Sequence, residues 1–370
     1  MKSELKFLMF GGFLGAGKTT AIRKYVSWLS LSRGLRTAVI TNDQASGLVD
    51  SELMKESGIA TDEIAGGCFC CKSDLLMQSA EKLINDVDPD VILGEPVGSC
   101  TDLISTVSAP LEEIFQAPFV VGPLSVIVDP LRVERFLKRD GDGVFDESDI
   151  DYIYGKQLEE AQVIVINKRE LLSPVRLQTL ENALRGKYPA AAVFAVSARK
   201  GDGLEQWWEY LETVAVVQKR GMEMDYQRYA DAEARMGWLN GTLRLRGTES
   251  MDVNAHGKLF TDALVEAFQG GNIRVAHFKL LVKPMVAGTK VDDHAVIQWV
   301  DNTTVPEFTT KTDIQSPEVS VIVNLRAESE PEIIRAVVEQ CFALIAEGKV
   351  VVEKELTSFA PSAPKPVHRV

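Results

Sequence analysis

The stretch "GGFLGAGKTT", residues 11–20, decides the fold of the first half of the chain because it matches the phosphate-loop pattern G-x-x-x-x-G-K-[ST]. The apolar run "KFLMF" precedes it as a predicted strand, and "GKTTAIRKYVSWLS" follows it as a predicted helix. In such a loop, backbone N–H groups at the helix N-terminus point at a phosphate group. The alternative is a glycine-rich turn that merely resembles the pattern, and the agreement of motif, strand and helix argues against it.

The loop predicts a nucleoside triphosphate site with magnesium. The ammonium group of Lys18 would reach the β- and γ-phosphate oxygens, and the hydroxyl group of Thr19 would bind Mg²⁺. The residues predicted to bind the nucleotide here are Gly12, Gly15, Ala16, Gly17, Lys18, Thr19 and Thr20.

Further short apolar runs follow, separated by helix-like segments: "RTAVITND", "DVILGEPVG", "LSVIVDP", "AQVIVINK" and "AAVFAVSA". Continuous apolar runs are typical of strands that are buried on both faces of a parallel sheet. The first half is therefore predicted to be an α/β domain with a doubly wound, mostly parallel sheet.

The second half differs, since runs such as "LNGTLRLRG" partly alternate and two amphipathic helices end in glycine. We predict a nucleotide-binding domain over residues 1–217 and a linker over 218–235. A smaller α+β domain is expected over 236–350, and a disordered, Pro-rich tail over 351–370.

Composition excludes several classes of protein. The 370 residues carry a formal net charge of −13, which repels phosphate backbones and anionic lipid, so neither nucleic acid nor a membrane is an expected partner. Apolar runs stay short of the roughly 18 residues that span a bilayer. A cytoplasmic protein with reduced thiols is expected, and its five cysteines do not form a disulfide scaffold.

"EPVG" and two later tetrapeptides extend the nucleotide site. Glu95 ends a predicted strand, where a carboxylate would hold the Mg²⁺ shell or the attacking water, and Gly98 would sense the γ-phosphate. The alternative for Glu95 is a helix-capping acid. The predicted catalytic residues are thus Lys18, Glu95 and Gly98.

"NKRE" and "VSAR" predict guanine as the base. Asn167, Lys168 and Glu170 follow one predicted strand, and the Glu170 carboxylate can accept both N1–H and N2–H₂ of guanine, which adenine cannot match. Ser197 and Ala198 follow the next strand, and their backbone would meet guanine O6. The 1–217 domain is therefore predicted to be a P-loop GTPase.

"GGCFCC", residues 66–71, has three interpretations. Cys68, Cys70 and Cys71 would be core residues, a redox pair or a thiolate metal site. Three cysteines after a Gly-Gly pair make a poor core, and a reducing compartment disfavours disulfides, so we favour a site for Zn²⁺ or another soft ion. The fourth ligand would be water, a client protein's side chain, Asp43 or Cys100.

Cys100 lies two residues past Gly98, in "EPVGSC". If it binds the metal, the nucleotide state could move one metal ligand directly. The alternative is a small buried residue that packs against the next helix.

These motifs together resemble the CobW-type branch of P-loop GTPases, over roughly residues 6–215. The resemblance is carried by "GFLGAGKTT", "EPVG", "NKRE" and the intact "GGCFCC". Two departures stand out. The family's guanine motif ends in Asp where this chain has Glu170, and its Asn-Glu-x-Gly motif is replaced by Asn42-Asp43 with no glycine before Gly47. Asp43 would join the metal shell, as the family's Glu does, or serve Mg²⁺.

The resemblance implies a GTP-hydrolysing metallochaperone, or a metal or corrinoid cofactor-insertion factor. It would use Mg²⁺ with GTP and GDP, carry Zn²⁺ (or Co²⁺ or Ni²⁺), and serve a client metalloenzyme or corrinoid protein. Slow intrinsic turnover is expected, accelerated by metal, by client or by a nucleotide-dependent homodimer. Two alternatives stay open: a non-catalytic adaptor that is switched by nucleotide, and a P-loop ATPase or kinase with structural zinc.

Overall fold

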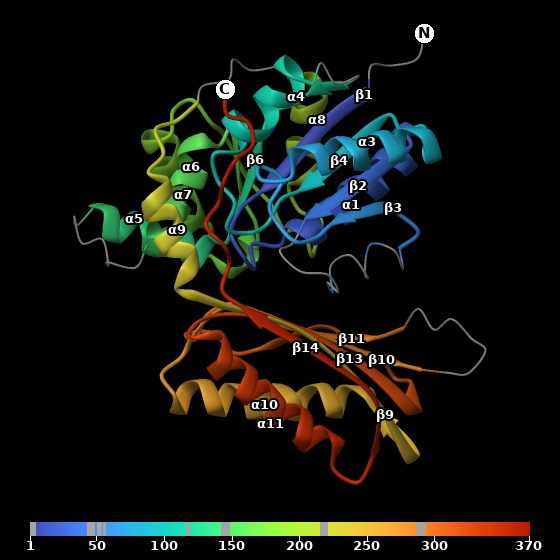
Figure 1. The fold of residues 1–370 in the computed structure, drawn as a ribbon. Coiled ribbons are helices and arrows are strands. Elements are labelled where there is room, and N and C mark those ends of the chain that lie inside the picture. The colour runs from blue at the N-terminus through green and yellow to red at the C-terminus, as the bar shows by residue number, and fades with distance from the viewer. Residues whose placement is uncertain are drawn as a thin grey trace. The chain divides into compact units, whose positions relative to one another are not determined.

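The computed structural model describes residues 5–42, 49, 54, 57–115, 119–141, 149–214, 221–285 and 293–370. The chain divides into two compact units, which Figure 1 shows with the chain coloured from blue to red. The first unit comprises Met1–Gln44, Ser57–Ala232 and Ala363–Val370, and the second comprises Ala45–Glu56 and Glu233–Ser362.

The first unit is built on a parallel sheet with the strand order β3-β2-β4-β1-β6-β7-β8, in which β5 pairs with β1. Its strands are β1 (Leu5–Gly11), β2 (Thr37–Asn42), β3 (Ala60–Ile64), β4 (Val91–Glu95), β5 (Phe119–Val121), β6 (Ser125–Val128), β7 (Val163–Ile166) and β8 (Ala192–Ala195). This confirms the predicted doubly wound sheet.

Helices cover both faces of this sheet (Figure 1). The α-helices are α1 (Lys18–Trp28), α3 (Ser73–Val87), α4 (Ala109–Glu113), α5 (Pro130–Gly141), α6 (Asp149–Glu160), α7 (Pro174–Lys187), α8 (Leu204–Thr213) and α9 (Tyr226–Ala234). Two π-helical segments, η1 (Leu29–Arg33) and η2 (Ile104–Ser108), and the 3-10 turn η3 (Arg169–Leu171) join them.

Aromatic packing fixes α1 on the sheet. The ring of Phe10 lies 5.7 Å from that of Tyr25 on α1 and 4.9 Å from that of Trp207 on α8. All three side chains are at most 1% exposed. Because such rings bury large areas and prefer specific geometries, they hold α1, which begins within the phosphate-loop motif, against β1.

Strand β3 was not among the predicted strands. Its sequence, "ATDEI", is mostly polar, and only Ile64 is buried. Edge strands carry polar residues and need little burial, so periodicity does not reveal them. Strand β3 nevertheless matters, because the cysteine motif begins directly after it.

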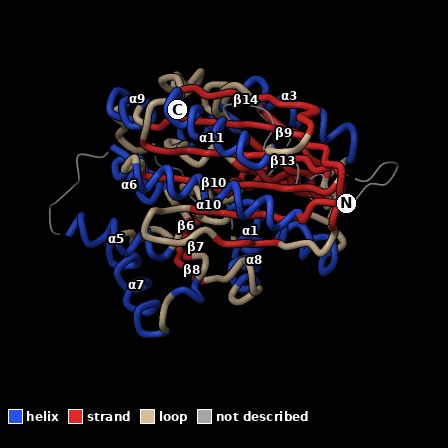
Figure 2. Tube along the Cα trace, turned by 90° about the horizontal axis from the view of Figure 1, so that it is seen from below, coloured by secondary structure: helices blue, strands red, loops and turns tan. Residues whose placement is uncertain are grey.

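The second unit has an antiparallel sheet with the order β12-β11-β10-β13-β9-β14, covered on one face by α10 and α11 (Figure 2). Its elements are β9 (Met236–Asp252), α10 (Val253–Gly270), β10 (Arg274–Pro284), β11 (Ala295–Trp299), β12 (Glu307–Thr310), β13 (Gln315–Glu328), α11 (Pro331–Ala346) and β14 (Val350–Phe359). A core of buried apolar side chains, Phe260, Phe268 and Phe342 among them, lies between sheet and helices. The smaller α+β domain is confirmed.

The division of the chain differs from the predicted boundaries at several points. Residues 45–56, predicted within the first domain, belong to the second unit. Of these, Val49 packs with Leu281 and Val296, and its N–H donates to Asn324 Oδ1 over 2.9 Å. An apolar cluster and a buried hydrogen bond thus attach Val49 to the second sheet.

The prediction of a disordered tail was wrong. Strand β14 pairs with β9 over residues 350–359, because its β-branched run completes the sheet edge before the prolines begin. Residues 363–370 then return to the first unit. The predicted linker, 218–235, contains α9, whose Tyr229 is 1% exposed and donates its hydroxyl proton to Ser99 O over 3.0 Å.

Within the described part of the chain, no helix combines the length and the apolar character that crossing a membrane requires.

Candidate functional site

The carboxyl ends of the parallel strands bring the predicted motifs to one edge of the sheet. The phosphate loop follows β1, Asn42 ends β2, the cysteine motif follows β3, and Glu95 ends β4. The order β3-β2-β4-β1 therefore places the cysteine motif and the phosphate loop along the same edge, with the ends of β2 and β4 between them.

The phosphate loop has the backbone that its glycines require. Gly17 has a φ of 93°, in the left-handed region, and a Cβ atom there would overlap the side-chain amide of Asn167. Lys18 is 8% exposed, and its Nζ donates to Gly12 O over 2.9 Å. The loop thus presents an ammonium group and a helix N-terminus to the same small space, which suits a phosphate group.

Thr19 and Glu95 form a pair of hard oxygen donors beside this loop. Thr19 Oγ1 donates to Glu95 Oε1 over 2.9 Å, and both residues are 7% exposed. A hydroxyl oxygen and a carboxylate oxygen side by side suit Mg²⁺. The bond joins two side chains, so it does not support the alternative that Glu95 caps a helix. Gly98 lies against the loop as well, since a Cβ atom on it would sit 3.0 Å from Leu14 N.

The Asn167 side chain links the phosphate loop to the segment after β8 that carries Ala198. Its Nδ2 donates to Ala16 O over 2.8 Å, and its Oδ1 accepts from Ala198 N over 2.9 Å. Lys168 Nζ donates to Gly15 O over 2.8 Å and forms an ion pair with Asp129 over 2.9 Å. The Ala198 N–H, predicted to meet guanine O6, is thus bonded to Asn167 in this conformation.

Glu170 has the free acceptor that guanine recognition needs. Its Oε2 is buried and makes no hydrogen bond within the described residues. A buried carboxylate oxygen without a donor is costly, so a ligand that brings N–H groups would be favoured there. Guanine offers such groups on its N1 and N2 atoms.

We expect Glu170→Ala to weaken GTP binding about 10- to 100-fold, because a hydrogen bond to a charged group contributes roughly 1.5–3 kcal/mol. Inosine triphosphate, which lacks the 2-amino group, should lose less. Fluorescence titration with both nucleotides measures this, and Glu170→Asp is the matched control that keeps the carboxylate. Equal losses for both nucleotides, or none, would contradict the assignment.

Asn42 orders the loop that carries the cysteines. Its Nδ2 donates to Ile64 O over 3.0 Å and to Gly67 O over 2.7 Å, and its Oδ1 accepts from Phe69 N over 2.9 Å. Backbone bonds from Cys71 N and Lys72 N to Cys68 O then close a turn. This turn is what lets cysteines on opposite sides of an extended chain converge.

The sulfur atoms of Cys68, Cys70 and Cys71, the thiol cluster, all lie within 4.8 Å of one another. The separations are 2.7 Å for Cys68–Cys70, 3.2 Å for Cys68–Cys71 and 3.7 Å for Cys70–Cys71. A tetrahedral zinc ion with Zn–S bonds of about 2.3 Å needs sulfur atoms about 3.8 Å apart. The sulfur atoms of Cys70 and Cys71 already have this separation. The distances from Cys68 to the other two sulfur atoms would each increase by about 1 Å or less.

The fourth thiol, that of Cys100, is 2% exposed and reaches Cys68. Hydrogen bonds from Cys100, Cys70 and Cys71 hold the pKa of Cys68 well below its usual value, because they stabilise the thiolate. Bonding to Cys68 raises the pKa of Cys70 and brings that of Cys71 to about 11. The cluster thus contains one thiolate and neighbouring protonated thiols. A metal ion that bound all of these soft ligands would displace the remaining protons.

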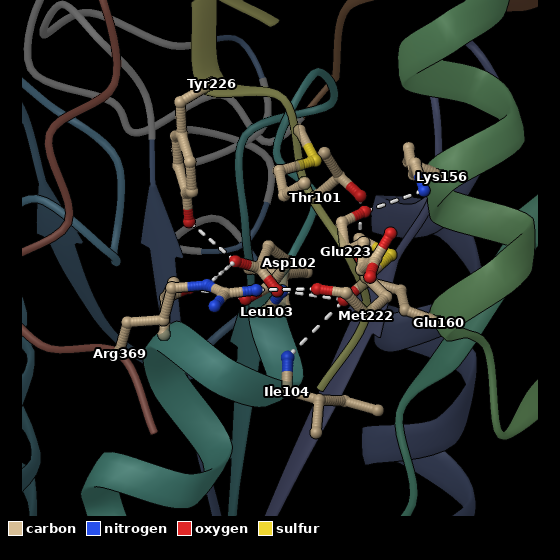
Figure 3. Close-up of polar contacts among 12 residues, drawn as sticks. Thr101, Asp102, Leu103, Ile104, Lys156, Glu160, Met222, Glu223, Tyr226 and Arg369 are labelled. Carbon is tan, nitrogen blue, oxygen red and sulfur yellow. Dashed lines mark hydrogen bonds and ion pairs between the residues drawn. The ribbon is translucent and has the colours of Figure 1, made fainter. Parts of the chain in front are cut away.

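Residues 95–104, the connecting segment, lead from Glu95 to Cys100 and on to η2. Gln157 on α6 donates to Gly98 O over 2.9 Å and to Cys100 O over 2.8 Å. Glu160, also on α6, accepts from Thr101 Oγ1 over 3.1 Å and from Leu103 N over 2.7 Å (Figure 3). Helix α6 therefore holds the connecting segment from Gly98 to Leu103.

We expect Glu160 to make stability depend on pH. Burial raises its pKa from 4.5 to about 8, so the folded chain binds a proton that the unfolded chain has lost between these values. Stability therefore falls as pH rises through this window, by up to about 1.4 kcal/mol per pH unit. Urea unfolding of wild type and Glu160→Gln at pH 5.5 and 8.5 measures it. The same pH dependence in both proteins would contradict the assignment.

Sequence reasoning missed several residues of this site. Gln157, Glu160, Tyr226 and Arg369 contact the connecting segment from distant elements, and no local pattern marks them. Asn42 carried a signal, since a buried amide at a strand end often orders a loop. The predicted ligand Asp43 lies outside the described residues.

A parallel sheet with a phosphate loop, a Thr–Glu pair and a guanine-type motif defines a P-loop GTPase. Residues 6–195 match the family described as CobW/HypB/UreG, nucleotide-binding domain, and the chain belongs to this family.

Two similar relatives are the zinc chaperone CobW of Pseudomonas aeruginosa and the zinc chaperone YeiR of Escherichia coli K12. The first is 28% identical over 54% of this chain and 58% of its own length, and the second is 31% identical over 46% and 48%. The chain thus spans about half the length of these relatives. Among solved structures, Zn(II)-bound YjiA GTPase from E. coli is 13% identical over 93% of this chain and 99% of its own, with a TM-score of 0.37.

Proposed function

We propose that the protein is a GTP-dependent metallochaperone that binds a metal ion at the thiol cluster and gives it to a client protein when GTP is hydrolysed. Its membership of the CobW/HypB/UreG family supports the nucleotide part. The names of the two relatives and the set of thiol ligands support zinc as the cargo.

One observation carries this proposal: the connecting segment touches both sites. At its start, Glu95 accepts from Thr19 of the phosphate loop, and five residues later Cys100 reaches Cys68 of the thiol cluster. A movement of the connecting segment at the nucleotide site would therefore also move Cys100 relative to the thiol cluster. Segments that follow the γ-phosphate in this way are common nucleotide switches.

Different residues would bind the nucleotide, assist its hydrolysis and respond to the loss of the γ-phosphate. The phosphate-loop amides and Lys18 would hold the β- and γ-phosphates, and Glu95 would orient the attacking water or the Mg²⁺ shell. Mg²⁺, when bound, would neutralise charge on the phosphates. Gly98 lies beside the loop, so its N–H would report whether the γ-phosphate is present. After hydrolysis the connecting segment would relax, and Cys100 would change its position relative to Cys68.

Transfer requires that the two nucleotide states bind the metal unequally, since equal affinity would move nothing. The expected coupling is roughly 5- to 150-fold in metal affinity. Slow intrinsic turnover would keep the loaded state until metal, client or a second copy accelerates hydrolysis. The second unit would contribute to the choice of client.

The test is zinc affinity, measured by competition with a chromophoric chelator in the presence of GDP and of a non-hydrolysable GTP analogue. Wild type should differ between the two states within the range above. Cys100→Ala should bring the two affinities together, whereas Cys341→Ala, a matched control on α11 of the second unit, should not. Equal zinc affinity in both states of the wild type would overturn the proposal.

The two alternative functions give different results in simple assays. A non-catalytic adaptor would show no GTP turnover even with zinc present, and an ATPase or kinase with structural zinc would let ATP displace GTP efficiently. The free acceptor at Glu170 and the intact Thr19–Glu95 pair favour a GTP-hydrolysing protein over both.

A further inference from the structure

Residues 363–370, the tail segment, lie against the loop that carries the thiol cluster. Lys365 N donates to Cys71 Sγ over 3.1 Å, and Val367 N donates to Cys70 O over 3.0 Å. Both donors are backbone groups, and they are two residues apart, so they face the same way along an extended chain. The tail segment thus runs beside Cys70 and Cys71 as a short added strand would.

The sequence of the tail segment suits this arrangement. Pro364 and Pro366 flank Lys365, so the chain is already restricted to extended conformations before it binds. Prolines also lack an N–H group, so the backbone donors to the thiol loop are Lys365 and Val367, which alternate with the two prolines. Pro364 is buried, which anchors this part of the chain.

The far end of the tail segment is fixed to the connecting segment. Arg369 Nε forms an ion pair with Asp102 over 2.8 Å, and its Nη2 donates to Met222 O over 2.6 Å (Figure 3). Asp102 is 1% exposed and also accepts from the hydroxyl group of Tyr226 over 2.6 Å. Val370 N adds a bond of 2.9 Å to Ser105 O.

The tail segment therefore contacts the thiol cluster at one end and, at the other, a carboxylate two residues past Cys100. Cys71 is the most exposed of the three thiols, so it is the one through which a chelator or a client would reach a bound metal. A hydrogen bond to a charged acceptor is roughly twice as strong as one between neutral groups. An N–H aimed at sulfur thus stabilises a thiolate that binds a metal, and such outer partners tune metal affinity.

We propose that the tail segment is part of the metal site and slows metal release. The Lys365 N–H stabilises the metal-bound thiolate of Cys71, and Arg369 is a positioning residue that holds the tail segment on the connecting segment through Asp102. Opening of the Arg369–Asp102 pair frees the tail segment and exposes Cys71. This inference rests on the proposed function in one respect, that the thiol cluster takes up zinc.

The central experiment compares Lys365→Pro with Lys365→Ala in the 370-residue chain. Both remove the side chain, but only proline removes the N–H, and the neighbouring prolines already impose the extended conformation that it needs. Zinc release into excess chromophoric chelator should be about 10- to 100-fold faster for Lys365→Pro. Lys365→Ala should release zinc at the wild-type rate. Equal rates for the two variants would overturn the role of the N–H.

A second readout reports on the sulfur itself. In the Co²⁺-loaded protein, loss of the N–H should shift the thiolate-to-cobalt charge-transfer band for Lys365→Pro and leave it in place for Lys365→Ala. A variant that was merely less stable would release metal faster without this shift. An unshifted band in both variants would contradict the contact with Cys71.

Arg369→Gln tests the anchor. It should speed zinc release about tenfold or more. Arg274→Gln, which removes an ion pair with Glu328 in the second unit, is the matched control and should not change release. Wild-type release from Arg369→Gln would overturn the positioning role.

Failure of the inference and failure of the proposed function are distinguishable. If Cys68→Ser binds zinc as tightly as wild type, the thiol cluster is not the zinc site and the proposed function fails. If Cys68→Ser loses zinc while the tail variants behave as wild type, only the inference fails.

Discussion

Zinc affinity is expected to fall more than about 100-fold when Cys68 is replaced by serine, since even partners outside the ligand set change metal affinity 10- to 100-fold. Cys68 has the central sulfur of the cluster, because it lies 2.7 Å from Cys70 Sγ and 3.2 Å from Cys71 Sγ and also contacts Cys100. A hydroxyl group is a poor ligand for a soft or borderline ion, so serine keeps the size of the side chain and loses the bond.

The measurement is zinc competition with a chromophoric chelator on the nucleotide-free chain. Cys341→Ala is the matched control, since it also removes one buried thiol but lies on α11 of the second unit. It should bind zinc as the wild type does. A Cys68→Ser protein with wild-type affinity would refute the thiol site.

Replacing Lys18 by alanine is expected to lower the GTP turnover number at least about 100-fold. The ammonium group would contact the β- and γ-phosphates of a bound nucleotide, and removing one charge-stabilising group in comparable sites costs 10²- to 10³-fold. The buried position of Lys18, 8% exposed and bonded to Gly12 O, means that the charge acts where water screens it little.

Phosphate release from GTP measures this loss. Lys24→Ala on the same helix is the control, because Lys24 is exposed and lies outside the loop. Its turnover should match that of the wild type. If Lys18→Ala hydrolyses GTP at the wild-type rate, the phosphate loop does not act in hydrolysis.

Local patterns predicted where the nucleotide motifs lie in the sheet. The phosphate loop, Glu95 and Asn167 all lie at or directly after the ends of predicted strands. Their shared edge follows because parallel strands bring their carboxyl ends to one side of the sheet whatever the lengths of the intervening helices. The order of motifs along the chain therefore becomes an order along the sheet.

Prediction failed where a segment has little apolar character of its own. Strand β3, "ATDEI", is held by pairing with β2 rather than by burial. Strand β14 and the tail segment were predicted together as one disordered tail, because Pro-rich sequence follows the strand directly. Both are ordered by backbone hydrogen bonds to distant residues, and backbone groups leave no trace in side-chain patterns.

The sequence by itself determined that this chain has a phosphate loop, a guanine-type motif and three clustered thiols. Each of these is a short run whose chemistry is complete in its own residues. Only the tertiary structure decided that Cys100 reaches Cys68, and that Lys365 N meets Cys71 Sγ across 294 positions of the chain. Such contacts join residues that are far apart in the sequence. They depend on where distant elements pack and not on any local pattern.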